Sequence, residues 1–395
     1  MKILYADYNM FGKTDIIEAF RKLGHEVEET NIPLKYESDT AKLADEMDSL
    51  IGEVGCDVVF TSNFHPELVA PCEKHGVKYM SWTYDSPLVA LYDKEILSPV
   101  SYAFHFDSAE VAGLKARGAK QIWYMPLAVN PERLSKIEIS AADRKLFGAD
   151  VSLVASLYNE KHNLCDRLAD KLEALGDGYT AGFLDGVLHA QVNLLGGSIL
   201  EDVLRQHTDI VKAMYKAMPY PLTEGSIADE IYVYAYYFLA RKAANMQRMK
   251  MIKAVSERFD TKVYTGGDLS GISTVKAMGT VDYMTDMTKV FKCSKVNLNI
   301  TLPSIRTGMP LRTLDIMGAG GFLMTNHQTD FDAFFDLGID YGCYDSVDDL
   351  LYTIEYYLEH EDEREEIRLR GHEKTVGAFT YENMLSQMLE IVEEA

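Results

Sequence analysis

Side chains that suit an anionic ligand gather between residues 301 and 312. Two guanidinium groups, three hydroxyl groups and one glycine fall in this stretch: Thr301, Ser304, Arg306, Thr307, Gly308 and Arg312. Guanidinium and hydroxyl groups bind phosphate oxygens, and a glycine lets backbone N–H groups approach a ligand closely. The pattern therefore predicts a phosphate-binding loop. The alternative is an ordinary crossover loop that is exposed and binds nothing.

The elements around this loop would position it. An apolar-rich run at 295–301 predicts a buried strand, and residues 311–318 have helical spacing, with Leu311, Leu314 and Met317 on one face. A second strand is predicted at 322–325. A strand, loop, helix and strand in this order indicate a parallel sheet, where ligands lie beyond the carboxyl ends of the strands. Helix N-termini there favour anions.

Composition excludes several functional classes. The net charge of −22 over 395 residues argues against a nucleic-acid polymer as partner, which would require a basic face. Five scattered cysteines without a CxxC pair indicate a reducing compartment and make a zinc site unexpected. No apolar stretch approaches the roughly 20 residues of a membrane span, and the N-terminus does not resemble a signal peptide. We expect a cytoplasmic protein.

The first 130 residues alternate between strand and helix patterns. Helices are clearest at 14–23, 41–54 and 108–117, and six strands are predicted at 2–7, 26–30, 58–62, 79–85, 102–106 and 121–125. This alternation is typical of a doubly wound α/β domain. The turn after the first strand lacks the G-x-G-x-x-G fingerprint of dinucleotide-binding domains.

Three side chains near the ends of these strands are candidates for acid–base chemistry. Asp85 follows the fourth strand and precedes Ser86-Pro87, which disfavours helix at that point. His65 follows the third strand, and Asp107 follows the fifth. Asp85 and His65 have structural alternatives, because Asp85 also suits an Asx-turn or helix cap and His65-Pro66 also suits a helix start.

Residues 131–150 read as a linker, and a second α/β region spans 151–380. Its first strand, 151–156, leads into a loop with Lys161, a candidate phosphate ligand. Residues 177–258 contain only helical patterns, at 181–195, 199–218 and 227–259, and read as an insertion, a candidate oligomer interface or platform for an acceptor protein. Strands resume at 262–265, 275–278 and 341–344, and a helix is expected at 329–335. The final helix, within 381–395, is predicted to cross back onto the first domain.

Several segments resemble the CgeB-like bacterial glycosyltransferases of the spore-maturation-protein type, a glycosyltransferase family 1-like group. The resemblance is carried by SIRTGMPLRTLDIMGAGGFLMTN and HEKTVGAFTYENMLSQML in the second half, and by YMSWTYDSPLVALYD, YAFHFD, MPLAVN and VSLVASLYNEKHN before them. It implies a GT-B fold, in which two Rossmann-like domains face each other across a cleft. It also implies a metal-independent transferase without a cofactor that uses a nucleotide-activated sugar.

The resemblance assigns the donor to the second domain. Asp315 stands where this fold usually has a glutamate that holds the ribose hydroxyls, although an ion pair with Arg312 on the helix surface is the alternative. Arg306 and Arg312 would stabilise the departing diphosphate. The other residues expected around the donor are Tyr264, Gly266, Gly267, Asn299, Thr301, Gly308, Gly320 and Gly321.

One position departs from the resemblance. Many relatives carry a second glutamate eight residues before the ribose-binding one, and it contacts the donor sugar; here that residue is Thr307. The expected function is glycosyl transfer to a protein, glycan or small molecule that the sequence does not identify. Asp85, His65 and Asp107, in that order, are the expected bases if transfer inverts the sugar. The alternatives are a sugar-nucleotide epimerase or a non-catalytic carbohydrate or assembly module.

Overall fold

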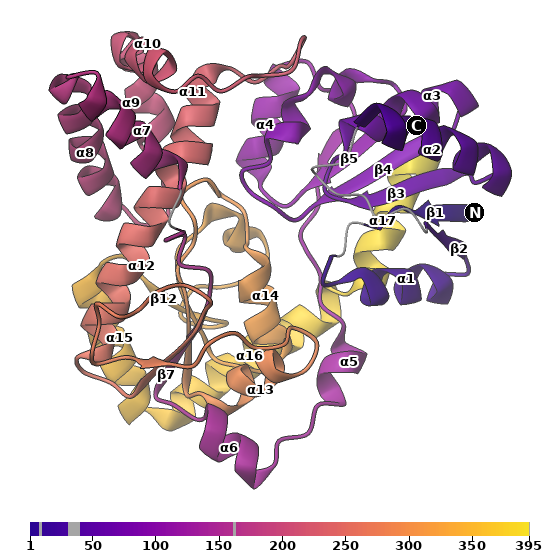
Figure 1. The fold of residues 1–395 in the computed structure, drawn as a ribbon. Coiled ribbons are helices and arrows are strands. Elements are labelled where there is room, and N and C mark those ends of the chain that lie inside the picture. Colours follow the sequence, from indigo (N-terminus) through magenta and orange to yellow (C-terminus); the bar gives the residue numbers. More distant parts are fainter. Residues whose placement is uncertain (8–9, 31–39, 161–162, 395) are drawn as a thin grey trace. The chain divides into compact units, whose positions relative to one another are not determined.

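The computed structural model describes residues 1–7, 10–30, 40–160 and 163–394 (Figure 1). They form two compact units. Unit 1 comprises Met1–Asn130, Thr223–Ala228 and Ala378–Ala395, and unit 2 comprises Pro131–Leu222 and Asp229–Gly377. The chain thus passes between the units more than once, and a short piece of the helical block, 223–228, belongs to unit 1.

Unit 1 is built on a parallel six-stranded sheet with the order β2-β1-β3-β4-β5-β6. Its strands are β1 (Lys2–Tyr5), β2 (Glu26–Glu29), β3 (Val58–Ser62), β4 (Lys78–Thr83), β5 (Ser101–His105) and β6 (Ile122–Tyr124). All six predicted strands are confirmed, with ends that differ by at most two residues. The central strands β3 and β5 are buried along their whole length, as expected for a parallel sheet covered on both faces.

The helices of unit 1 include three that the apolar spacing predicted. These are α1 (Lys13–Lys22), α2 (Thr40–Val54) and α4 (Ser108–Ala116), with α3 (Val69–His75), α17 (Tyr381–Glu394) and the 3-10 turns η1 (Pro66–Leu68), η2 (Val89–Tyr92) and η3 (Lys94–Leu97) in addition. Helix α3 was missed because it is short and contains Pro71. Helix α17 packs on α1, where Lys22 pairs with Glu382 at 3.1 Å.

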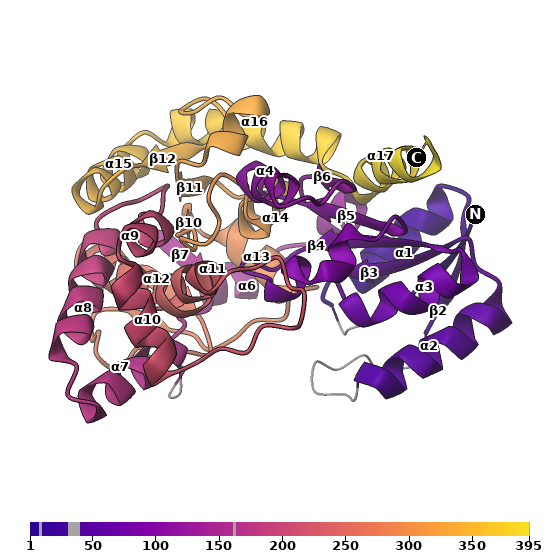
Figure 2. The same cartoon turned by 90° about the horizontal axis from the view of Figure 1, so that it is seen from above.

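Unit 2 has a second parallel six-stranded sheet, with the order β12-β11-β10-β7-β8-β9. Its strands are β7 (Val151–Val154), β8 (Thr261–Tyr264), β9 (Lys276–Ala277), β10 (Val296–Asn299), β11 (Leu323–Asn326) and β12 (Gly342–Tyr344). Every strand predicted in this half is confirmed. Figure 2 shows β7, β10, β11 and β12 following one another across the sheet.

The helices of unit 2 differ from the sequence prediction in four places. They are α5 (Pro131–Ser135), α6 (Ala141–Phe147), α7 (Leu164–Ala174), α8 (Gly178–Val192), α9 (Leu200–Gln206), α10 (Thr208–Ala217), α11 (Glu230–Tyr232), the π-helix η4 (Val233–Leu239), α12 (Ala240–Ser256), α13 (Asp286–Cys293), α14 (Leu311–Gly318), the 3-10 turn η5 (Thr329–Ala333), α15 (Val347–Glu359) and α16 (Glu361–Ala378). The expected linker contains α5 and α6, and the helix expected over 199–218 breaks at His207. The helix expected over 227–259 contains the π-helical turns, and 329–335 is a 3-10 turn.

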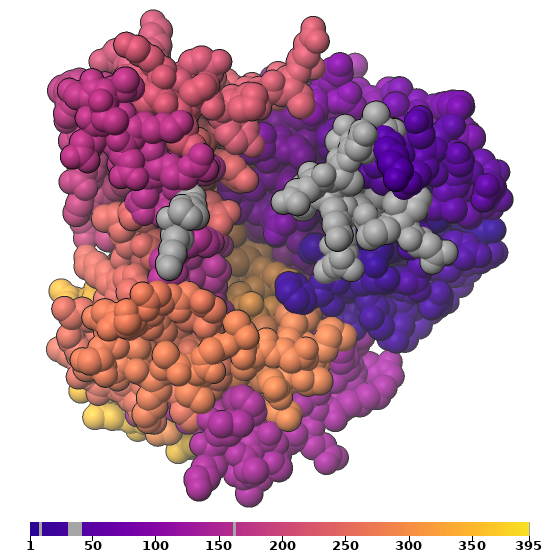
Figure 3. Space-filling model, in the orientation of Figure 1, coloured from indigo at the N-terminus to yellow at the C-terminus, as the bar shows by residue number. Residues whose placement is uncertain are grey.

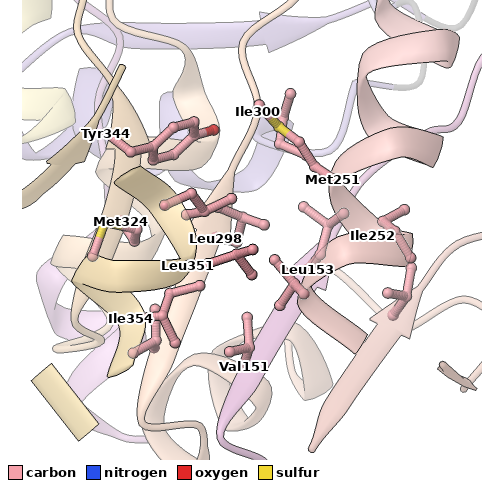
Figure 4. Packing of buried hydrophobic residues seen from close by; sticks show 14 of the residues in the cluster. Val151, Leu153, Met251, Ile252, Leu298, Ile300, Met324, Tyr344, Leu351 and Ile354 are labelled. Atoms are coloured by element: carbon pink, nitrogen blue, oxygen red, sulfur yellow. The ribbon is translucent and has the colours of Figure 1, made fainter. Parts of the chain in front are cut away.

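Helix α12 belongs to the core of unit 2. Its Met251 and Ile252 lie beside Val151 and Leu153 of β7, in a cluster that also contains residues of β10, β11 and α15 (Figure 4). The residues expected to be an insertion therefore include one helix that covers the sheet. Helices α7 to α10 gather at the end of unit 2 opposite α6, and their surface forms the upper left of Figure 3.

No helix in the described ranges combines the length and the apolar character that crossing a membrane would require.

Glycines in two helices of unit 2 provide a test of packing. A Cβ atom on Gly371, in α16, would lie 2.2 Å from the Asp340 carbonyl oxygen, whereas a Cβ on Gly186, in the middle of α8, meets nothing within 4 Å. We expect Gly371→Ala to lower the free energy of unfolding by about 1–3 kcal/mol through overpacking. Gly186→Ala should raise it by about 0.5–1 kcal/mol because alanine favours helix. Urea unfolding measures both, and equal effects would contradict the packing around α16.

Candidate functional site

The strand order of unit 2 reverses between β7 and β10. From β7 the chain continues to β8 on one side, and it later crosses to β10 on the other side of β7. Ligands of such sheets lie beyond the carboxyl ends of the strands at this switch point. The loop after β10 is the stretch 301–312 that the sequence indicated as an anion site, and the loop after β7 contains residues 155–160.

Arg248 of α12 joins these two strand ends. Its guanidinium donates to the carbonyl oxygen of Ser156, after β7, and to that of Ile300, after β10, the latter at 2.8 Å. The side chain is 7% exposed, and its Nε has no hydrogen-bond partner among the described residues. No carboxylate in the described chain pairs with it, so its positive charge is not cancelled by an ion pair.

Arg312 adds a second positive charge near Arg248. Burial lowers the pKa of Arg248, and the charge of Arg312 lowers it further. Arg312 lies in the first turn of α14 and pairs with Asp315 at 3.1 Å. Of these two guanidinium groups, only that of Arg312 is shown paired with a carboxylate among the described residues, which leaves an excess of positive charge in a chain whose net charge is −22.

Tyr158 lies between two arginines in the loop after β7. The guanidinium carbons of Arg241 and Arg248 lie 5.0 and 4.9 Å from the centre of its ring. Its φ of +53° is left-handed, which is unusual for a bulky residue. Gly267, after β8, approaches the same loop so closely that a Cβ would lie 2.7 Å from Asn159 Oδ1. The loops after β7 and β8 are thus held against each other.

Asp315 is buried in α14 with both carboxylate oxygens engaged. Oδ1 accepts from the Tyr283 hydroxyl and Oδ2 accepts from Arg312, each at 3.1 Å. The ion pair that the sequence offered as an alternative is therefore present. It leaves further lone pairs on each oxygen, so the ion pair and an accepted ligand hydroxyl are compatible.

The polar residues at the end of β10 support the loop backbone. Asn299 Nδ2 donates to the hydroxyls of Thr301 and Thr325 at 3.1 and 2.9 Å. The backbone N–H of Thr301 donates to Asn326 Oδ1 at 3.0 Å. The resemblance implied that Asn299 and Thr301 contact the donor. In the structure, these hydrogen bonds engage the Asn299 amide and the Thr301 hydroxyl and N–H, and they hold the loop in place.

A carboxylate from another element reaches Thr307. Its hydroxyl donates to Asp330 Oδ2 at 3.3 Å, and the backbone N–H of Asp330 donates to the Thr307 carbonyl at 3.0 Å. Asp330 lies in η5, after β11, and is 9% exposed. Arg306 is partly exposed and Gly308 is buried in the same loop.

Three residues expected near a donor lie elsewhere. Gly320 and Gly321 come just before β11, so they lie at the amino edge of the sheet, opposite the switch-point loops. Their small size serves packing there, because a Cβ on Gly321 would lie 2.9 Å from the Phe291 carbonyl oxygen. Tyr264 is 2% exposed and packs on Phe147, and burial raises its pKa to about 12. We therefore leave these three out of the donor site.

Gly266 and Lys161 complete the expected donor residues. Gly266 follows β8 and makes only an ordinary contact, since its Cβ would lie 3.6 Å from Thr280. Lys161 lies outside the described residues, and its expected role stays a prediction.

Unit 1 brings the three candidate bases to one edge of its sheet but exposes only one. Asp85 is exposed and accepts from Asn63 Nδ2 at 2.8 Å. Asp107 is 1% exposed and caps α4, accepting from the N–H groups of Ala109 and Glu110. His65 is 2% exposed, directly precedes η1 and lies 3.6 Å from Glu67. The helix start that was the alternative for His65 is therefore observed, and the cap that was the alternative for Asp85 is instead made by Asp107.

Comparisons with known proteins agree with this architecture. Residues 243–390 match the family model described as glycosyl transferase-like. Sucrose-phosphate synthase from Thermosynechococcus elongatus is similar over 100% of this chain and 98% of its own, with 10% identity and a TM-score of 0.57. HepE of Anabaena in complex with UDP-glucose is similar over 100% of both chains, with 11% identity and a TM-score of 0.54. No curated protein sequence matches the chain.

The chain has the GT-B fold. The family model begins within α12 and includes Arg248 and the whole of the β10–α14 segment. Sequence reasoning missed Arg248, although a signal was present. A charged residue at 248 shares the apolar face of α12 with Met251, Ile252 and Val255, and a charge on a core-facing position requires a partner.

Arg248 and Arg241 form a matched pair for a stability test. Replacing Arg248 by methionine removes the donors to two carbonyl groups, that of Ile300 being buried, so Arg248→Met should lower the free energy of unfolding by about 2–4 kcal/mol. The Arg241 side chain is 37% exposed and, among the described residues, contacts Glu160 and the Tyr158 ring, so Arg241→Met should cost less than about 1 kcal/mol. Urea unfolding of both variants checks this, and similar small effects would show that Arg248 does not hold the strand ends.

The buried imidazole of His65 predicts a pH dependence of stability. Burial lowers its pKa, so below the ordinary value near 6.5 the unfolded chain binds a proton that the folded chain does not. Its contribution is fully present above pH 6.5 and is lost as the pH falls toward the lowered value. The free energy of unfolding should fall from pH 7.5 to 5.5, less steeply for His65→Gln. His189→Gln, on exposed α8, is the control; an unchanged slope in His65→Gln would contradict the assignment.

Proposed function

We propose that this protein transfers a glycosyl group from a nucleotide-activated sugar to an acceptor hydroxyl. The observation that carries the proposal is the pair of guanidinium groups, Arg248 and Arg312, at the switch point of unit 2, within the segment that matches the glycosyl transferase-like model. HepE, which has the same fold, was solved with UDP-glucose. A nucleoside diphosphate is the anion that such a site suits.

In the proposed donor site the arginines stabilise the diphosphate. Negative charge grows on the leaving diphosphate as its bond to the sugar breaks, and fixed positive groups lower the energy of that state. Arg312 would contact phosphate directly, with Arg306 in the same loop. Arg248 would act through its electrostatic potential and by fixing the two backbone carbonyl groups to which it donates. We propose that the transfer needs no metal ion, because these guanidinium groups supply the positive charge.

Asp315 would hold the ribose in the same proposal. Its oxygens accept from Tyr283 and Arg312, and a carboxylate has about four lone-pair sites, so it can also accept from ribose hydroxyls. Thr307 stands where the resemblance expects a glutamate. The Thr307 hydroxyl donates a hydrogen bond to the carboxylate of Asp330. We propose that sugar hydroxyls meet Asp330 or Thr307 in place of that glutamate.

Asp85 fits the role of base better than His65 or Asp107. A general base must reach the acceptor hydroxyl, and of the three only Asp85 is exposed. Asp107 is engaged as a helix cap, and His65 is buried beside Glu67.

Nucleotide binding is the direct test. UDP, GDP, CDP, ADP and dTDP, with their sugars, are compared by thermal unfolding. A ligand at 100 times its dissociation constant stabilises the folded state by about 2.7 kcal/mol, which gives a shift of a few degrees in Tm. Arg312→Ala should abolish the shift. Arg370→Ala, which removes an exposed arginine paired with Glu366, should not.

Asp315→Ala separates the contribution of the ribose contact to binding from that of the phosphate contact. It should weaken nucleotide binding, while inorganic pyrophosphate binds as before because Arg312 remains. A flat response of the wild type to the whole panel would reject the proposal in favour of a non-catalytic module. A nucleotide sugar inverted at C2 without added acceptor would instead identify an epimerase.

A further inference from the structure

Asn63 has an unusual backbone at the carboxyl edge of the unit 1 sheet. It follows the last residue of β3 directly and has φ of +67°, in the left-handed region. In the described residues only Asn63 and Tyr158 combine a side chain with positive φ. Such strain persists where surrounding contacts hold it, and it concentrates at functional sites.

The hydrogen bonds of Asn63 connect it mainly to the end of β4 and the residues that follow, while its carbonyl oxygen accepts from the Thr61 hydroxyl at 2.6 Å. Its backbone N–H donates to the Trp82 carbonyl at 2.8 Å. Its side-chain Oδ1 accepts from the N–H groups of Tyr84 and Asp85 at 2.8 and 3.1 Å. Its Nδ2 donates to Asp85 Oδ2 at 2.8 Å. One buried carboxamide therefore fixes both the backbone and the carboxylate of Asp85.

This arrangement leaves one oxygen of Asp85 for a ligand. Asn63 is 2% exposed, whereas Asp85 is exposed. Oδ2 is occupied by the amide, and Oδ1 makes no hydrogen bond within the described part of the chain. A carboxylate with one oxygen held and the other directed to solvent is preorganised to accept a proton from an incoming hydroxyl.

The residue type at position 63 follows from these contacts. Aspartate at this position would accept from the two N–H groups but would repel the Asp85 carboxylate. Glycine would adopt the left-handed backbone without strain but would bind nothing through a side chain. Asparagine tolerates positive φ and both donates and accepts, so it meets the two requirements together.

We propose that Asn63 is the positioning residue for Asp85 as general base, an inference that rests on the proposed transfer. The acceptor oxygen attacks the anomeric carbon of the donor while Asp85 Oδ1 takes the hydroxyl proton. The bond between the anomeric carbon and the diphosphate oxygen breaks, and its electron pair leaves with the nucleoside diphosphate. With water as acceptor, the same steps release free sugar.

The test uses water as the acceptor and the nucleotide sugar that gives the largest thermal shift. Release of nucleoside diphosphate is followed for the wild type, Asn63→Gly, Asp85→Ala and the double variant. We expect Asn63→Gly to lower kcat by about 10- to 100-fold and to leave the dissociation constant of the donor unchanged. Asn63→Asp should lower kcat at least as much, because it puts a second carboxylate beside Asp85.

The double variant separates positioning from a merely structural role. If Asn63 acts through Asp85, Asn63→Gly adds no further loss to Asp85→Ala, whereas independent effects multiply. Asn383→Ala, whose carboxamide in the same unit binds the Ala378 carbonyl, should leave kcat unchanged. The thermal midpoint of each variant reports folding.

Three outcomes overturn the inference while donor binding stands. They are an unchanged kcat in Asn63→Gly, multiplicative losses in the double variant, and a wild type that binds donor but releases no diphosphate above the buffer rate. Failure to bind any nucleotide sugar rejects the proposed function itself and, with it, this inference.

Discussion

The proposed donor region depends on one buried guanidinium. Arg248 binds the carbonyl groups that follow β7 and β10, so it holds together the two strands between which unit 2 reverses its order. Burying a charge without a carboxylate is costly, and here two carbonyl dipoles and the Tyr158 ring offset part of that cost. In the proposed donor site this uncancelled charge attracts an anion, so the same contact would serve both stability and ligand preference.

Backbone strain occurs at corresponding places in both units. Asn63 follows β3 in unit 1, and Tyr158 lies in the loop after β7 in unit 2. Each strand is next to the point where its sheet reverses order. Left-handed φ in such residues costs about 1–3 kcal/mol and requires specific contacts to hold it. Asn63 has its hydrogen bonds to the exit of β4, and Tyr158 has two guanidinium groups against its ring.

The site was predicted in part from particular residues. The loop 301–312 was found because strand, glycine, arginine and helix patterns are local, and Arg312 and Asp315 do lie together at the start of α14. Asp107 and His65 were ranked behind Asp85, and the structure shows them buried. Arg248 was missed because its partners, Ser156 and Ile300, are distant in sequence. Gly320 and Gly321 were placed with the donor, although they pack at the other edge of the sheet.

The sequence by itself determined the alternation of strands and helices, and hence two parallel sheets, because apolar periodicity and turn residues are read within a few positions. It also indicated residues 301–312 as a candidate anion site, which stays a prediction. Only the tertiary structure decided which arginine joins β7 to β10, which carboxylate stays exposed in unit 1, and that α12 covers the sheet. Those outcomes depend on contacts between residues that are far apart in the chain. A local sequence pattern does not show which distant residues come into contact.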